Sequence, residues 1–328
     1  MFLDEVIITV KSGDGGRGCE SYLRRADRKM IPTGGDGGDG GDVIVRADRN
    51  TGSLLSLKSR RIFEAERGSL GKGSNKYGHQ GKSLVVLVPC GTTVYDYQKR
   101  LLLRDLVNHG DEVTVAKGGR GGYGNHLGRP ATFGKSGETL ELFLSFTVIA
   151  DIVMVGLPGS GKTTLLKALT EANVEPASYP FATKTPCLGT YESGKHSFSI
   201  CELPSIYSAS HDGRGHGVHY LKHLHRAKLI FFVVDPLNSF AQGIKDGYDV
   251  LLKEVEGFNG DYLNLPRCLV VNKIDLKEAK KAISKRIKFK DPVFQISAQN
   301  GTGLKTLMKQ AIKWLVKRRE PKKQFQSV

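Results

Sequence analysis

Residues 156–163 of this 328-residue chain read GLPGSGKT, which matches the phosphate-binding pattern GxxxxGK[ST]. An apolar run precedes this loop and a helical run follows it, so the strand–loop–helix context of the pattern is present. Backbone N–H groups of such a loop surround phosphate groups together with the positive end of the helix. We expect Lys162 to reach the β- and γ-phosphates and the Thr163 hydroxyl to bind Mg²⁺. The predicted phosphate-binding residues are Gly156, Leu157, Pro158, Gly159, Ser160, Gly161, Lys162 and Thr163.

A second motif, NKID at residues 272–275, ends another apolar run further along the chain. A carboxylate at Asp275 can accept hydrogen bonds from N1–H and the exocyclic amine of guanine, a donor pair that adenine lacks. The motifs therefore predict a guanine-nucleotide-binding domain, and NKID argues against the alternative of a P-loop ATPase or small-molecule kinase. The predicted base-binding residues are Asn272, Lys273, Ile274 and Asp275, with Ser297, Ala298 and Gln299 after the next strand.

Around these motifs, the second half of the chain alternates apolar runs with helical patterns. The strand candidates are separated by segments long enough for crossover helices, which predicts a parallel, doubly wound α/β sheet. The last helix carries one apolar stripe at helical spacing, formed by Leu304, Leu307, Met308, Ala311, Ile312 and Leu315. The strand candidates are residues 150–155, 197–201, 229–234, 268–272 and 293–297.

The first half of the chain is unusually rich in glycine. Residues 1–150 hold 26 of the 40 glycines, gathered in the clusters 13–18, 34–41 and 118–124. Short strand-like runs frame these clusters, which predicts an all-β core from which glycine-rich loops project. Glycine at every second or third position lets extended, polyproline-II-like segments pack closely, because no Cβ intervenes. The alternative is a flexible low-complexity linker.

Composition and charge exclude several classes of protein. With 39% hydrophobic and 25% charged residues, the chain is neither a disordered tail nor a membrane protein, and we expect no stable membrane insertion. Five scattered cysteines without a CxxC pair argue against a zinc ribbon and favour a cytoplasmic location. The net charge of +16 is typical of a polyanion-binding protein, and residues 276–328 contribute most of it, with 15 basic and 3 acidic groups.

With these residues in hand, the chain resembles the Obg family of GTPases, which assist assembly of the large ribosomal subunit. The glycine clusters at 34–43 and 118–125 are similar to the family's glycine-rich amino-terminal domain. The stretch 179–189 is similar to its first switch, and LKHL at 221–224 resembles the helix after its second switch.

This resemblance implies a glycine-rich, all-β Obg-type domain at residues 1–148 with six polyproline-type segments. It also implies a Ras-like α/β P-loop GTPase (G) domain at 149–328, with a basic carboxy-terminal helix. The implied ligands are GTP or GDP and Mg²⁺, and the implied partner is the large ribosomal subunit with its rRNA; we expect a cytoplasmic monomer. The implied rRNA contacts are basic residues near the loop tips, Arg17, Arg24, Arg25, Arg120 and Arg129.

The same resemblance assigns the switch residues of the G domain. Thr183 matches the threonine that ligates Mg²⁺ with Thr163, and Lys162, Thr183 and Glu202 are the implied catalytic residues. The additional nucleotide contacts that it implies are Phe181, Ala182, Thr183, Lys184 and Thr185 from the first switch and Glu202, Leu203, Pro204 and Ser205 from the second.

The second switch departs from the family pattern Asp-x-Pro-Gly. Glu202 stands where the family has an aspartate that orients a water on Mg²⁺, and its side chain is one methylene longer. Ser205 replaces a glycine that swings through backbone angles, and Gly159 replaces the P-loop asparagine associated with potassium. We therefore expect slow GTP hydrolysis. The alternative is a hydrolysis-deficient, rRNA-binding assembly placeholder.

A cluster of five histidines invites a metal hypothesis, since two of them, His219 and His223, are four residues apart and would share one face of a helix. The cluster consists of His211, His216, His219, His223 and His225. No cysteine or carboxylate stands within four residues of His219 or His223 to complete a site, and His223 lies within LKHL. We expect these histidines to be surface or packing residues.

Overall fold

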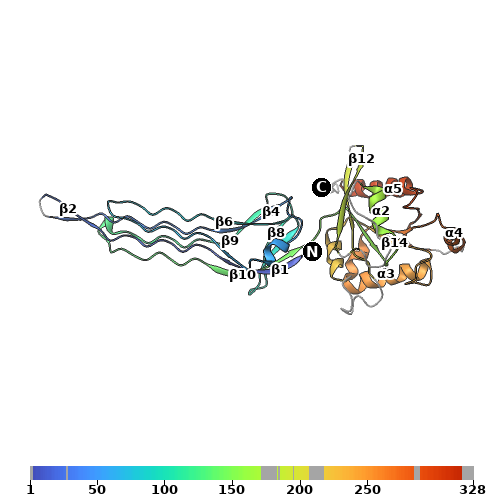
Figure 1. The fold of residues 1–328 in the computed structure, drawn as a ribbon, viewed down its shortest axis with the longest axis horizontal. Helices are drawn as coiled ribbons and strands as arrows, with labels where there is room; N and C mark the ends of the chain where they lie inside the picture. Colours follow the sequence, from blue (N-terminus) through green and yellow to red (C-terminus); the bar gives the residue numbers. More distant parts are fainter. Residues whose placement is uncertain are drawn as a thin grey trace, which may run out of the picture. The chain divides into compact units, whose positions relative to one another are not determined.

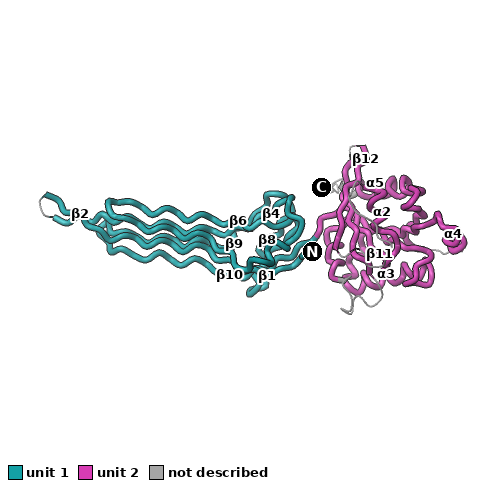
Figure 2. The backbone as a smooth tube through the Cα atoms, viewed as in Figure 1, with its two compact units in different colours: residues 1–147 teal, residues 148–328 magenta. Residues whose placement is uncertain are grey.

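The structure is a computed structural model that describes residues 3–26, 29–170, 183, 185–194, 196–206, 218–283 and 289–319. The chain forms two compact units, residues 1–147 and 148–328 (Figure 2). The division falls one residue before the domain boundary expected from the sequence. Each unit has its own buried core, so each is described by itself.

Unit 1 contains two small sheets at one end of an array of extended segments (Figure 1). The five-stranded sheet has the order β5-β1-β10-β7-β8, and the three-stranded sheet has the order β6-β4-β9. A separate hairpin, β2–β3, lies at the other end of the array. The elements are β1 (Glu5–Lys11), β2 (Tyr22–Arg24), β3 (Met30–Pro32), β4 (Val43–Asp48), α1 (Leu55–Lys58), β5 (Ile62–Glu64), β6 (Leu84–Pro89), β7 (Thr92–Asp96), β8 (Leu101–Leu106), β9 (Glu112–Ala116), the 3₁₀ helix η1 (Asn125–Leu127) and β10 (Thr139–Phe146).

Six extended segments form the array, and backbone hydrogen bonds join each of them to its neighbours. Gly37 N donates to Gly122 O at 2.8 Å, and Gly16 N donates to Gly38 O at 2.8 Å. The linker alternative is therefore wrong for this stretch, because the glycine clusters form an ordered, cross-bonded array. The segments are residues 12–19, 33–42, 65–72, 76–83, 117–125 and 131–138.

The aspartates of the GGDGGDGGD repeat fix the register of this array. Their carboxylates accept hydrogen bonds from glycine N–H groups of segment 117–125, at 2.6–2.7 Å. A three-residue period returns each aspartate to the same side of a polyproline-II-like segment, which explains the spacing of the repeat. The pairs are Asp36 with Gly124, Asp39 with Gly121 and Asp42 with Gly118.

Unit 2 is built on a six-stranded sheet with the order β12-β13-β11-β14-β15-β16. Strand pairs from β13 to β16 are parallel, as the alternation of apolar and helical runs predicts. The elements are β11 (Ile152–Gly156), α2 (Lys162–Leu169), β12 (Cys187–Ser193), β13 (His196–Glu202), the 3₁₀ helix η3 (Val218–Arg226), β14 (Leu229–Val234), α3 (Ile244–Asn259), the 3₁₀ helix η4 (Gly260–Asn264), β15 (Arg267–Val271), α4 (Lys277–Ile283), β16 (Val293–Gln295) and α5 (Leu304–Arg319).

Helices cover both faces of this sheet (Figure 1). On one face, α2 and α5 pack on alternate strand residues such as Met154 and Phe231, which are fully buried. The predicted stripe of α5 lies in this core, with Leu307, Met308, Ala311 and Leu315 at most 1% exposed. On the other face, the Phe232 ring lies 5.4 Å from that of Tyr248 on α3.

One edge strand of this sheet was not among the strands expected from the sequence, and it is not parallel to its neighbour. β12 pairs with β13 in antiparallel register, from Cys187 opposite Glu202 to Ser193 opposite His196. A hairpin forms here because the chain turns at once after Ser193, where Gly194 adopts a positive φ of 59°. An antiparallel edge strand on an otherwise parallel sheet is common in α/β folds.

The premise of the histidine hypothesis is also wrong. η3 is a 3₁₀ helix, in which residues three apart share a face, so His219 and His223 point in different directions. His223 is fully buried, and its Nδ1 accepts a hydrogen bond from Val148 N at 3.1 Å. Within the described residues, no group of three or more histidine, cysteine, aspartate or glutamate side chains could hold a metal ion. His211 and His216 lie outside the described residues.

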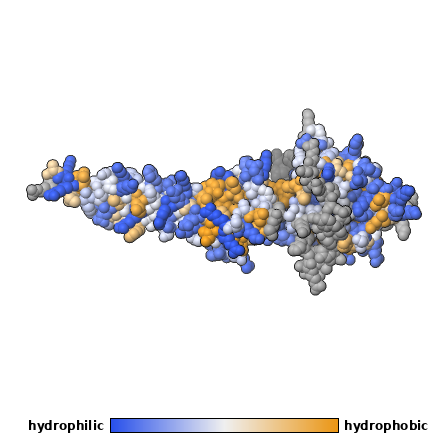
Figure 3. Space-filling model, viewed as in Figure 1, coloured by the Kyte–Doolittle hydropathy of each residue, from blue (hydrophilic) through white to orange (hydrophobic). Residues whose placement is uncertain are grey.

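The surface of unit 1 is divided by hydropathy. On the face in Figure 3, apolar residues gather at the sheet end, whereas polar residues mainly cover the array of extended segments. Exposed apolar side chains at the sheet end include Ile7, Ile62 and Leu87. In the part of the chain that the structure describes, no helix combines the length and the apolar character needed to cross a membrane.

Candidate nucleotide-binding site

The candidate residues of unit 2 follow the carboxyl ends of four sheet strands. The phosphate loop follows β11, the second-switch segment begins at the last residue of β13, NKID follows β15, and residues 297–299 come shortly after β16. Ligands of parallel α/β sheets bind at this edge, where loops from several strands meet. The sheet therefore brings together motifs that are far apart in the sequence.

Glycine is required at two positions of the phosphate loop. Gly159 and Gly161 adopt positive φ angles of 72° and 85°, which L-residues with a Cβ rarely tolerate. A Cβ on Gly161 would also lie 2.4 Å from the Asn272 side-chain nitrogen. α2 begins directly after this glycine, so its free N–H groups face the loop.

Lys162 is held in place by oxygens of the phosphate loop and the second switch. Its ammonium donates to the carbonyls of Gly156 and Leu157 at 2.9 and 3.1 Å, and to Ser205 Oγ at 2.8 Å. The residue is only 4% exposed. Burial lowers the pKa of this ammonium from 10.5 to about 8, although the negative charge of Glu202 opposes the shift. An anionic ligand at this place would favour the charged form of the lysine.

A cluster of three oxygens lies beside the lysine. Thr163 Oγ1 donates to Glu202 Oε1 at 2.6 Å, Thr183 Oγ1 donates to the same oxygen at 3.0 Å, and the two hydroxyls are 3.1 Å apart. Glu202 is 1% exposed, and burial raises the pKa of its carboxyl, while Lys162 and the two hydroxyls lower it.

This cluster has the chemistry of a magnesium site. Hydroxyl and carboxylate oxygens are ligands that Mg²⁺ prefers. Glu202 Oε2 is buried without a hydrogen-bond partner among the described residues, so one carboxylate oxygen remains for a cation. The residues therefore fit Mg²⁺, with Thr163 and Thr183 as the expected ligands.

Asn272 connects the phosphate loop to the base loops. Its side-chain amide donates to Ser160 O at 3.0 Å, and its side-chain oxygen accepts from the backbone N–H groups of Lys273 and Ala298 at 2.8 and 3.0 Å. Ile274 N donates to Ile296 O at 3.2 Å, so the two base loops are also joined directly. The NKID asparagine is thus a positioning residue that fixes three loops in one arrangement.

The remaining predicted residues have different surroundings. Asp275 and Gln299 are exposed, whereas Ser297 and Ala298 are buried. Around Pro204, the second-switch segment lies along the end of β11, where the phosphate loop begins, because Leu203 N donates to Met154 O and Ile206 N donates to Gly156 O. Thr185 lies just before β12, and its carbonyl accepts from Cys187 Sγ. Phe181, Ala182 and Lys184 lie outside the described residues.

Two residues of this site were not expected from the sequence. Asn238 is buried and donates to Pro158 O at 2.8 Å, which fixes the phosphate loop from a second side. Asp235 binds the Lys273 ammonium at 2.8 Å, and Lys273 has a positive φ of 62°. Asp235 could have been found from its position in the sequence, since it comes directly after β14, at the edge of the sheet where ligands bind.

Comparison with known proteins identifies both units. Residues 3–144 match the family model GTP1/OBG, and residues 151–273 match a model described as 50S ribosome-binding GTPase. "GTPase Obg" of Chlorobaculum tepidum is 39% identical over 93% of this chain and 93% of its own length. The chain belongs to the Obg family of GTPases. "GTPase Obg" of Syntrophomonas wolfei is 37% identical over 94% of this chain and 76% of its own length. Membership of the Obg family supports GTP binding at the site described above.

Solved G-domain structures resemble part of the chain. A single-substitution variant of NFeoB from S. thermophilus, bound to GDP·AlF₄⁻, is 24% identical with a TM-score of 0.41, over 51% of this chain and 64% of that one. A single-substitution variant of Era from Aquifex aeolicus, also bound to GDP·AlF₄⁻, is 23% identical with a TM-score of 0.40, over 51% of this chain and 56% of that one. The chain thus spans less than two thirds of either of these proteins.

The arginines expected at the loop tips of the Obg-type unit pack partly on aromatic rings. The guanidinium of Arg17 lies 4.5 Å from the centre of the Phe133 ring, and that of Arg129 lies 3.7 Å from the centre of the Tyr123 ring. Arg120 lies 5.7 Å from the same Tyr123 ring, and Arg24 and Arg25 are exposed near the β2–β3 hairpin. Cation–aromatic pairs of this kind present both charge and a stacking surface.

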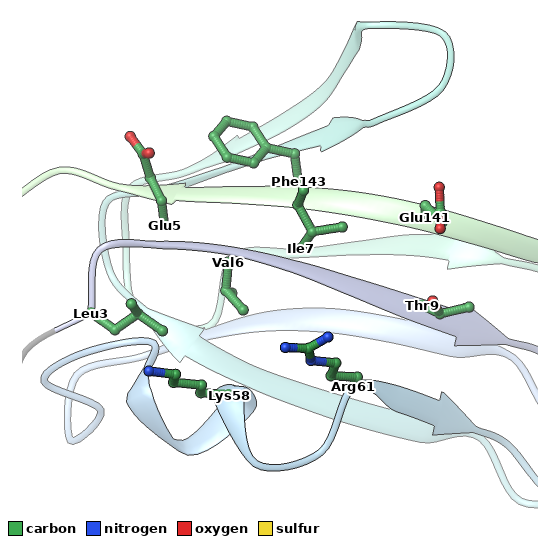
Figure 4. A pocket seen from close by; sticks show the side chains of 9 residues that line it. All are labelled: Leu3, Glu5, Val6, Ile7, Thr9, Lys58, Arg61, Glu141 and Phe143. Carbon is green, nitrogen blue, oxygen red and sulfur yellow. The ribbon is translucent and has the colours of Figure 1, made fainter.

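The Obg-type unit also has a shallow concavity on its five-stranded sheet (Figure 4). Lys58 from the end of α1 and Arg61 from just before β5 lie along one side, and Glu141 and Phe143 lie along the other, from β10. Its lining mixes charges of both signs with apolar groups. All the residues that line this concavity belong to unit 1, whereas the phosphate and base motifs belong to unit 2.

Proposed function

We propose that this chain is a guanine-nucleotide-binding, Mg²⁺-dependent GTPase that acts in assembly of the large ribosomal subunit through contact with rRNA. The observation that carries the proposal is the Asn272 bridge. By binding Ser160 and Ala298, it holds the phosphate loop and the base loops in one arrangement. The exposed Asp275 follows in the same loop, where its carboxylate is available to the N1–H and amine of guanine.

Each residue at the phosphate end has a role in this proposal. Lys162 replaces its bond to Ser205 with bonds to the β- and γ-phosphates and stabilises negative charge that develops on their oxygens. Thr163 and Thr183 hold Mg²⁺, which neutralises phosphate charge when bound. In this proposal, the Ser205 N–H donates to the terminal phosphate.

Ribosome contact is assigned to the Obg-type unit. Its arginine–aromatic pairs offer phosphate binding and base stacking, which are the two chemistries used on single-stranded RNA. The family-model description of a 50S ribosome-binding GTPase supports the large subunit as the partner. This function would place the protein in the cytoplasm, where ribosomal subunits are assembled.

Co-sedimentation tests this proposal. The full-length protein would be centrifuged with purified large and small ribosomal subunits in GDP, GTP or a non-hydrolysable GTP analogue. We expect it to pellet with large subunits, and more strongly with the analogue than with GDP. Equal binding to large and small subunits, or binding that is the same with each nucleotide, would contradict a nucleotide-dependent role on the large subunit.

Replacing Asp275 should change which base the protein binds. Asp275→Asn exchanges a carboxylate for an amide that can donate to the 2-carbonyl of xanthine, so we expect preference to move from GTP to XTP. The loss of two charge-assisted hydrogen bonds should weaken GTP binding by about two orders of magnitude. Competition titrations with GTP, XTP and ATP would measure the change, and retained GTP preference would show that Asp275 does not read the base.

A second candidate function is a nucleotide-binding placeholder that does not hydrolyse GTP. The observation that favours it is the hydrogen bond from the Lys162 ammonium to Ser205 Oγ. This bond engages the ammonium that would otherwise bind the γ-phosphate. The glycine of the family pattern could not make this contact. Phosphate release measured with purified large subunits separates the two candidates, since turnover by the wild type excludes the placeholder.

Restoring the family's second switch should increase hydrolysis. In a Glu202→Asp, Ser205→Gly double variant, Lys162 is freed from the serine hydroxyl and the segment regains backbone freedom. We expect turnover to rise about tenfold, which corresponds to about 1.4 kcal/mol in the barrier. A Ser205→Ala variant, which removes only the hydroxyl, is the matched control. Unchanged turnover in the double variant would mean that these two residues do not limit hydrolysis.

A further inference from the structure

The three-oxygen cluster of the nucleotide site has the dimensions of a metal-binding face. Octahedral Mg²⁺ holds its ligands at 2.0–2.1 Å, which places neighbouring ligand oxygens about 2.9 Å apart. The three oxygens of Thr163, Thr183 and Glu202 are separated by 2.6, 3.0 and 3.1 Å. Each separation therefore approximates one edge of an octahedron around a single cation.

The length of the Glu202 side chain makes this arrangement possible. An aspartate at the end of β13 would end one methylene earlier, which withdraws its carboxylate by about 1.5 Å and leaves room for a water. Glutamate closes that gap, since its Oε1 already lies within hydrogen-bond distance of both threonine hydroxyls.

The Glu202 carboxylate forms no ion pair in the described part of the chain, although the charge of Lys162 acts on it from nearby. The nearby Lys162 ammonium bonds to two carbonyls and to Ser205, and none of the ion pairs among the described residues includes Glu202. Its Oε2 is buried without a hydrogen-bond partner there. A buried carboxylate with an unused oxygen is costly unless a cation binds to it.

We infer that Glu202 ligates the divalent cation of this site directly through its carboxylate, together with the hydroxyls of Thr163 and Thr183. This inference rests on the proposed function, because the cation arrives with the nucleotide phosphates. In this arrangement, Glu202 takes the place of the metal-bound water that the family's aspartate orients. The presence of Glu202 in place of the family's aspartate then changes how the cation is bound.

Electron paramagnetic resonance with Mn²⁺ as the probe tests this inference on the full-length protein. In complexes with Mn²⁺ and GDP, and with Mn²⁺ and a non-hydrolysable GTP analogue, ¹⁷O-labelled water reports the waters bound to the metal. We expect the wild type to bind one water fewer than Glu202→Asp. We also expect Mn²⁺ to dissociate about tenfold more readily from Glu202→Asp, the scale expected when a metal-site carboxylate is altered.

The matched control is Glu192→Asp, which makes the same change at an exposed position of β12. It should leave both the water count and the Mn²⁺ affinity as in the wild type. A second measurement needs no variant: in wild-type protein with ¹³C-labelled glutamate, direct ligation gives a carboxylate hyperfine coupling to Mn²⁺. This measurement tests direct ligation even in the case that the Glu202→Asp variant does not fold.

The outcomes separate the two proposals. Nucleotide and Mn²⁺ binding with equal water counts in wild type and Glu202→Asp, or with no ¹³C coupling, would overturn direct ligation and leave GTP binding intact. Failure of the wild type to bind guanine nucleotide at all would overturn the proposed function itself. One water fewer in the wild type, together with the ¹³C coupling, would establish Glu202 as a metal ligand.

Discussion

Lys162→Ala should abolish nucleotide binding without unfolding the protein. The change removes a buried positive charge that makes three hydrogen bonds at 2.8–3.1 Å. In the proposed complex, the ammonium pairs with phosphate oxygens, and removing one partner of a buried charge pair costs about 3–5 kcal/mol. The expected loss of GDP affinity is therefore about two to four orders of magnitude, measured by calorimetry or with a fluorescent GDP analogue.

The free energy of unfolding of Lys162→Ala should not fall along with its GDP affinity, because burial of the charged lysine is itself unfavourable. Its pKa of about 8 shows that the surrounding protein disfavours the charged form. Lys167→Ala is the matched control, since Lys167 lies on the same helix but is exposed, and it should bind GDP like the wild type. Undiminished GDP binding by Lys162→Ala would show that residues 156–163 do not hold the phosphates.

The nucleotide site was largely predictable because its motifs are local in sequence. The glycine loop needs positive φ angles at fixed positions, and Gly159 and Gly161 provide them. Parallel strands end at the same edge, so Lys162, Glu202 and Asn272 could be expected to approach one another before any coordinates were known. What could not be predicted was the direct contact of Glu202 with both threonines, because it depends on a side-chain length and on loop positions that no periodicity encodes.

The parts that sequence patterns missed depend on contacts between distant segments. β12 pairs antiparallel with β13, although its sequence has no run of alternating apolar residues to mark a strand. Asn238 acts only because the phosphate loop is folded beside it, 80 residues away in sequence. Strands β5, β7 and β8 also escaped prediction. β5 and β8 are the edge strands of the five-stranded sheet and expose most of their residues, whereas β7 lies between β10 and β8 and has the mixed sequence TTVYD.

The glycine repeat was recognised as a packing device, but the partners of each glycine could not be deduced. Asp36, Asp39 and Asp42 show the reason, because each accepts from a glycine more than 70 residues further along the chain. A three-residue period fixes which side of a segment faces inward. It carries no information about which of the other segments lies on that side.

Gly37→Ala should disrupt the extended array of unit 1. A Cβ added to Gly37 would lie 2.1 Å from Gly16 O and 2.4 Å from Gly16 C, which are backbone atoms that cannot rotate away. Gly37 N also donates to Gly122 O, so its segment is bonded to a second neighbour and cannot move aside freely. Overpacking against backbone on this scale costs about 3 kcal/mol or more. Hydrogen exchange followed by mass spectrometry should therefore show amides of residues 12–42 exchanging about 100-fold faster.

Gly52→Ala makes the same chemical change where the added Cβ has no heavy atom within 4 Å, and it should leave exchange unchanged. Both variants should bind GDP with wild-type affinity, because unit 2 has its own core and contains the phosphate and base motifs. If ribosome contact belongs to unit 1, Gly37→Ala alone should lose co-sedimentation with large subunits while retaining GDP. If amides of Gly37→Ala exchange at the wild-type rate, the segments do not pack this closely in solution. If the array is disrupted but the variant still binds large subunits, unit 1 does not make the rRNA contact.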